Sequence, residues 1–168
     1  MEEAVRPEGR PLTFNGPLEA GIRAVCILGA AHPKAFDLQR LIALDYLLVH
    51  TGDIGGPESL HPEAPFQSAA LLVRRKLIEN ALLLMMTRDL VRREISNEGI
   101  HYRAGENAAT FLAALETDYL KLLKKRARWL NDVVGKQTGE QFRALMRRFF
   151  EGWVEEFQNA ERSLGADS

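Results

Sequence analysis

Cysteine is nearly absent from this sequence: Cys26 is the single one in 168 residues. One thiol excludes an internal disulfide. Cys26 also lies inside an apolar stretch with helical spacing, which favours a packed, inert thiol over a nucleophile. The cysteine content therefore points away from thiol chemistry.

Long apolar runs are also missing. The longest candidates, residues 41–49 and 81–86, fall well short of the ~18 uninterrupted apolar residues that a membrane helix needs. The opening Met-Glu-Glu-Ala has no basic region followed by an apolar stretch, which an export signal would show. We therefore expect a cytoplasmic protein without a membrane partner.

Recognisable catalytic and ligand motifs are lacking as well. The sequence contains no Walker motif, no Gly-x-Ser-x-Gly elbow, no Gly-x-Gly-x-x-Gly and no His-Glu-x-x-His. Its four histidines are scattered, without metal-ligand spacing: His32, His50, His61 and His101. We therefore expect no catalytic residue, no cofactor and no metal, and a protein that is not an enzyme.

Asp45 stands out because it interrupts the apolar stripe of a predicted helix over residues 38–49. One interpretation is a carboxylate with a raised pKa; the other is a buried acid paired with a base such as Arg23. We favour the pair, because no second catalytic group can be placed beside Asp45.

The composition is that of an ordinary globular protein, with 46% apolar and 27% charged residues. A chain of this length forms one domain, or one with an appendage, and buries roughly 70% of its unfolded surface. The net charge is −1 but uneven. Residues 71–93 hold six basic side chains against two acids, and residues 121–128 hold five bases and no acid. This asymmetry leaves room for a face that binds nucleic acid or an acidic partner.

The middle of the chain predicts a winged-helix domain. Residues 70–90 read as a long helix, followed by two alternating strands at 91–96 and 100–103 and a further helix from Glu106. Between the strands, Asn97-Glu98-Gly99 ends in a glycine that suits a hairpin loop. We predict a mostly α fold: a winged-helix domain at 14–135 with a small β-hairpin wing, additional C-terminal helices, and a flexible stretch at 1–13.

Capping residues set the other helix boundaries. Pro17 suits a first helical position, and that helix should end before His32-Pro33. Asp37 and Thr117 are expected to cap later helices, the second of which ends at Gly135. The glycine- and proline-rich residues 51–67 are expected to form a long loop.

The helix at 70–90 carries apolar groups on two sides. We expect one side to be buried: Val73, Leu77, Ile78, Ala81, Leu82, Leu84 and Met85. The opposite side is polar except for Leu83, Met86 and Leu90, which favours a protein partner over a DNA groove. The alternative is a helix buried nearly all round by its own domain.

A second candidate contact surface lies near the C-terminus. After a break at 135–139, an amphipathic helix over 140–164 is predicted from an apolar stripe that includes Phe142, Phe149, Phe150, Trp153 and Phe157. This stripe either folds back on the domain or docks into a partner, where aromatic residues often carry binding energy.

Basic residues provide candidate DNA contacts. They are Arg74 and Arg75 on the long helix, Arg92 and Arg93 in the wing, and Lys121, Lys125 and Arg128 on one face of a later helix. Each set has an alternative interpretation as a solvated surface.

Four segments carry a resemblance to a known family: 14–23, 44–53, 59–62 and 71–129, the last including the wing. Together they resemble the small middle components of bacterial ABC-three-component systems, akin to Lamassu-type antiphage defence. The resemblance covers residues 14–135. It implies an adaptor that joins an SMC-like ATPase to an effector, often a nuclease, and helps to hold the effector until foreign DNA is sensed. It brings no catalytic residues. The alternative function is a DNA-binding winged-helix regulator or DNA sensor.

Overall fold

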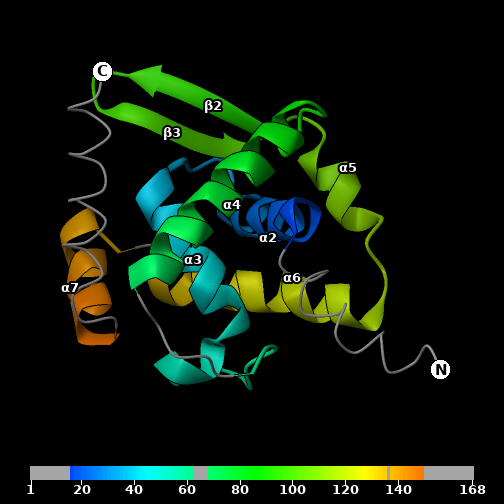
Figure 1. Ribbon diagram of the computed structural model, residues 1–168. Coiled ribbons are helices and arrows are strands. Elements are labelled where there is room, and N and C mark those ends of the chain that lie inside the picture. Colours follow the sequence, from blue (N-terminus) through cyan, green and yellow to red (C-terminus); the bar gives the residue numbers. More distant parts are fainter. Residues whose placement is uncertain (1–15, 63–67, 136, 150–168) are drawn as a thin grey trace.

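A computed structural model describes residues 16–62, 68–135 and 137–149. The described chain is mostly helical with a small antiparallel sheet (Figure 1). In order, its elements are α2 (Pro17–Ala31), β1 (Phe36–Asp37), α3 (Leu38–Val49), the 3₁₀ turn η1 (Thr51–Ile54), α4 (Ser68–Met86), β2 (Val91–Ser96), β3 (Gly99–Ala104), α5 (Ala108–Ala113), α6 (Asp118–Leu130), the π-helical turn η2 (Asn131–Gly135) and α7 (Gly139–Phe149).

Local capping chemistry accounts for the helix boundaries. Pro17 begins α2, which ends at Ala31 as the following His-Pro pair predicts. The Asp37 carboxylate accepts the Arg40 backbone N–H at 2.8 Å and begins α3. The Thr117 hydroxyl accepts the Leu120 N–H at 3.2 Å and begins α6. The predicted caps at Asp37 and Thr117 are thus confirmed.

The predicted hairpin is also confirmed. β2 and β3 pair antiparallel, and Ser96 faces Gly99 across a loop one residue shorter than expected. Gly99 has φ 109°, the conformation for which glycine suits this position. β1, a two-residue strand in which Phe36 pairs with Tyr102, was not predicted because it is too short to show an alternating pattern. The resulting strand order is β1-β3-β2.

The long helix ends earlier than expected, and this moves Leu90. α4 stops at Met86, Asp89 takes φ 56°, and the Leu90 N–H reaches back to the Met85 carbonyl at 3.0 Å. This is a Schellman-type helix end, which reverses the chain and directs the following apolar residue inward. Leu90 is only 6% exposed, so its predicted place on an outward partner-binding face is wrong.

The core centres on α2 and α3, which α4 and α6 cover (Figure 1). Every residue of α3 from Leu41 to Val49 is buried, as its apolar pattern predicts. α4 contributes Ile78, Ala81, Leu82 and Met85 to the core. Two members of its expected buried side lie outside instead: Val73 is 69% and Leu84 is 40% exposed.

The loop after α3 is fastened to α6. A Cβ on Gly56 would lie 2.2 Å from the Trp129 ring, so the loop backbone lies directly on that indole. The Arg126 guanidinium donates to the Glu58 carbonyl at 3.0 Å. Because of these contacts, the described part of the predicted loop is a packed segment of the domain.

α7 packs on the body of the domain. Phe142 is 4% and Met146 is 3% exposed. The Arg40 guanidinium lies over the Phe142 ring at 4.4 Å and donates to the carbonyls of Val134 and Gln137, each at 3.0 Å. The prediction that Phe142 contacts a partner is therefore wrong, because that side chain belongs to the core. Phe150, Trp153 and Phe157 lie outside the described residues.

Candidate partner-binding surfaces

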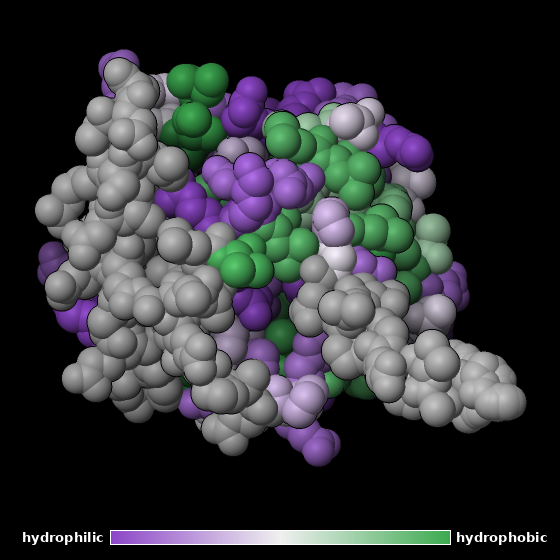
Figure 2. All heavy atoms as spheres, viewed as in Figure 1, coloured by the Kyte–Doolittle hydropathy of each residue, from purple (hydrophilic) through white to green (hydrophobic). Residues whose placement is uncertain are grey.

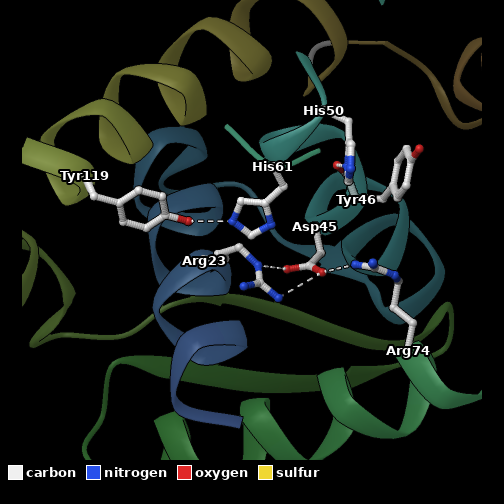
Figure 3. Close-up of polar contacts among 7 residues, drawn as sticks. All are labelled: Arg23, Asp45, Tyr46, His50, His61, Arg74 and Tyr119. Carbon is white, nitrogen blue, oxygen red and sulfur yellow. Dashed lines mark hydrogen bonds and ion pairs between the residues drawn. The ribbon is translucent and has the colours of Figure 1, made fainter. Parts of the chain in front are cut away.

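Among the described residues, the most deeply buried charged side chain is Asp45, which lies between two arginines (Figure 3). Its carboxylate accepts from Arg23 Nε at 2.7 Å and from Arg74 at 2.5 Å. Burial opposes ionisation, but the two guanidinium groups outweigh it and hold the pKa of Asp45 below its ordinary value. The predicted pairing of Asp45 with Arg23 is confirmed.

Arg74 joins this cluster rather than an outward surface. It comes from α4, its side chain is 25% exposed, and its guanidinium is directed at Asp45 (Figure 3). The salt bridge therefore links α2, α3 and α4 through a single carboxylate. The geometry does not support Arg74 as a DNA contact.

Two histidines complete the polar interior (Figure 3). His50 stacks on Tyr46 at 4.1 Å between ring centroids. His61 Nε2 lies 2.9 Å from the Tyr119 hydroxyl, tying the loop to α6. Burial and the neighbouring positive charge of Arg23 lower the pKa of His61 to about 4, so the ring is neutral at pH 7.

Of these contacts, the sequence predicted the pair of Arg23 and Asp45; Arg74, His61 and Tyr119 were not joined to it, because they are distant along the chain. The available signal was the occurrence of Asp45 and His50 in a segment that is otherwise fully apolar. Their contacts are structural: arginines hold the Asp45 carboxylate in salt bridges, and the Tyr119 hydroxyl forms a hydrogen bond with the His61 ring. Within the described residues, no group of three or more His, Cys, Asp or Glu side chains is placed to hold a metal ion.

The positive charge of the wing is largely compensated. Arg92 lies 3.2 Å from Asp89 and 3.9 Å from Glu106. Arg103 pairs with Glu94 across the hairpin at 2.5 Å. Arg93 pairs in register with Tyr102, on the face of the hairpin opposite to that of Arg92, and it is exposed. The wing therefore offers Arg93 as its candidate phosphate contact.

On α4, the predicted DNA contact Arg75 lies 4.0 Å from Glu79, and its side chain is 13% exposed.

α6 presents the least compensated basic surface. Lys121, Lys125 and Arg128 are all exposed, and within the described residues none of them forms an ion pair. The two other cations of this helix, Lys124 and Arg126, donate to backbone carbonyls. The predicted shared face of the first three residues is thus present as one row, called here the α6 basic row.

Apolar side chains are exposed on α4 and at the hairpin tip. Leu83 is 53% exposed on α4, and Met86 is half-buried. Ile95 and Ile100 face each other across the hairpin and are 73% and 47% exposed. Figure 2 shows apolar patches interrupted by hydrophilic groups on the side where α4 lies. Binding of a partner here would remove exposed apolar surface from water, which favours association.

A hollow of about 620 Å³ lies between α2, α5 and α6. Small residues form much of its wall, among them Gly29, Ala109 and Ala113. Lys124 and Arg128 of α6 stand along one side of it. This hollow was not predicted, because its walls come from three separated segments.

Comparison with known proteins identifies the family. None of the helices in the described residues is long and apolar enough to span a membrane. No curated protein and no solved structure matches the chain. Residues 13–156, most of the chain, match the model of the ABC-three component (ABC-3C) system Middle Component 2 family. The protein is therefore a member of that family, a middle component of a system built from several proteins.

Proposed function

We propose that this protein is a non-catalytic adaptor subunit of an antiphage defence complex, linking an SMC-like ATPase to an effector. The effector is a nuclease, which the adaptor helps to restrain until foreign DNA is sensed. The observation that carries the proposal is the family match, since a middle component works with other proteins. The exposed apolar side chains of α4 and of the hairpin supply surfaces for such contacts.

We also propose that the domain is a winged helix. Its order of elements is helix, short strand, two helices and a hairpin, with β1 pairing on the outside of β3. In a DNA-binding winged helix, α4 would enter the major groove. Here its exposed side carries Val73, Leu83 and Leu84, which have no donors or acceptors for base edges. The arrangement favours protein recognition by α4.

The polar interior supports a non-catalytic role. Asp45 is held as an ion by two arginines and is 1% exposed, so it is neither accessible nor available as a proton acceptor. Burial raises the pKa of Cys26 to about 12, which keeps its thiol protonated and unreactive. The Asp45 carboxylate and the Cys26 thiol thus serve the packing of the domain.

Two sets of side chains are proposed to contact companions. Leu83 and Met86 form the α4 contact, where exposure is observed. Phe149, Phe150, Trp153 and Phe157 continue the amphipathic pattern of α7 and are proposed as a second contact. An adaptor needs two such surfaces, one for each companion.

Co-expression of the tagged protein with the other two components of its system tests the adaptor. We expect both components to copurify with the wild type. Leu83→Asp should weaken capture of one component by roughly tenfold or more, because it places a charge in an apolar contact. Asn80→Asp, which adds the same charge one turn earlier on α4, is the matched control and should bind normally. A wild-type protein that purifies alone would refute the adaptor.

The alternative function, a DNA-binding regulator or DNA sensor, rests on the α6 basic row. Three phosphate contacts predict that log K for duplex DNA falls with log salt concentration at a slope of about −2.7. Failure of the isolated protein to shift duplex DNA at low salt would refute this function.

A further inference from the structure

The interior of the hollow between α2, α5 and α6 is apolar, and small residues form much of its lining. α2 supplies its floor with Cys26, Gly29 and Ala30, and α5 supplies one wall with Ala109 and Ala113. Both α5 and α6 contact α2. Leu112 of α5 packs onto Gly29, where an added Cβ would lie 2.5 Å from Leu112 Cδ1. Because alanine projects little, the backbone of a bound segment can approach the wall formed by Ala109 and Ala113 closely. A volume of about 620 Å³ accommodates several large apolar side chains.

The opposite side of the hollow is basic. Lys124 and Arg128 line it, and Arg128 also belongs to the α6 basic row with Lys121 and Lys125. Lys124 Nζ donates to the Leu112 carbonyl at 2.7 Å, at the C-terminal end of α5, which fixes that wall to α6. From Lys121 to Arg128 the row rises by seven residue steps, or about 10 Å along the helix. A ligand must therefore present several negative charges in a line beside an apolar surface.

This combination favours an acidic peptide over a nucleic acid. The residues that line the hollow include no Phe, Tyr or Trp ring on which a base could stack, and His32 is the one aromatic side chain among them. Glu106 also lines the hollow, and its side chain is 80% exposed. A nucleic acid carries phosphates along its whole length and would be repelled there, whereas an amphipathic helix can place apolar residues beside Glu106. A helix with carboxylates on one face and apolar side chains on the adjacent face matches both the α6 basic row and the apolar hollow, as in helix-in-groove recognition.

We propose that this hollow binds an acidic amphipathic helix supplied by a companion subunit. Carboxylates spaced three and four residues apart on that helix pair with Lys121, Lys125 and Arg128. The adjacent apolar side chains of the same helix enter the hollow between α2 and α5. This inference rests on the adaptor function and assigns the site at which one companion is held.

Two variants and two matched controls test the site in the complex. Ala109→Trp fills the hollow with an indole; Ala114→Trp adds the same side chain to an exposed position that does not line it. Lys121→Glu/Lys125→Glu/Arg128→Glu reverses the row, and Lys76→Glu reverses an exposed charge on α4. All positions named are exposed, so each variant should retain the wild-type circular dichroism spectrum and melting temperature.

The probe is capture of the two other components of the system, co-expressed with each variant. We expect the hollow-filling and row-reversing variants to lose one component by roughly tenfold or more, while both controls bind as the wild type does. A carbodiimide, which couples lysine amines to carboxylates in direct contact, should join Lys121 or Lys125 to an Asp or Glu of an amphipathic helix in that component.

Other outcomes are distinguishable. Wild-type capture by every variant would overturn the site and leave the adaptor standing. If the wild type captures neither component, the adaptor function fails and the site with it. Cross-links between two copies of this chain would show that a second copy occupies the site, and would overturn the proposal. Loss of duplex DNA binding in the row-reversing variant, with capture unchanged, would assign the row to nucleic acid and also overturn it.

Discussion

Removing the carboxylate of Asp45 should destabilise the domain strongly. Asp45→Asn removes the negative charge that lies against Arg23, whose side chain is 4% exposed. Arg74 loses the same partner, but it is 25% exposed and retains access to water. Breaking a buried ion pair in this way costs about 3–5 kcal/mol, mainly because the remaining charge stays buried.

The magnitude converts into a measurable change of melting temperature. For a chain of this size, each kcal/mol of lost stability lowers the melting temperature by about 2–4 °C, so Asp45→Asn should lower it by roughly 10 °C. Thermal and urea unfolding followed by circular dichroism give both numbers. Glu116→Gln removes a carboxylate from an exposed position and is the matched control, with an expected change within about 0.5 kcal/mol.

A double variant separates the loss of the pair from the loss of packing. In Arg23→Met/Asp45→Leu, both buried charges are replaced by apolar groups, and this should restore part of the stability lost in Asp45→Asn. If Asp45→Asn unfolds as the wild type does yet abolishes function in the complex, the structural account of Asp45 is refuted and a functional carboxylate takes its place.

Three further predictions follow from the interior. Because the pKa of His61 is about 4 in the folded chain and about 6.5 when unfolded, protons bind the unfolded form preferentially. Stability should therefore rise between pH 4 and 6.5, and His61→Phe should flatten this rise in urea titrations. Gly105→Ala should cost about 2–3 kcal/mol, because its Cβ would lie 2.2 Å from the Asp89 carbonyl oxygen, whereas Gly99→Ala meets open space and should cost about 1 kcal/mol, from its backbone conformation alone. Burial raises the pKa of Cys26 to about 12, so a thiol reagent at pH 8 should react with it only on denaturation; rapid labelling of the native protein would contradict this burial.

The local elements could be predicted from the sequence because their signals lie within a few residues. The alternation on either side of Gly99 identifies the hairpin, and Asp37 and Thr117 identify two helix starts. The burial of α3 follows from its apolar composition on every side. Each of these features depends on backbone geometry and on neighbours one to four residues away, which sequence periodicity reports directly.

Tertiary structure decided which apolar and charged groups face water. α4 has apolar groups on both sides, so periodicity alone did not show that Leu84 is exposed and that Leu90, past the helix end, turns inward. Phe142 is buried because α7 packs against the domain, and Arg74 is held by Asp45 from a helix distant in sequence. Periodicity shows which residues share a face; only the packing of distant segments shows which face lies against the core, because burial depends on what is placed opposite.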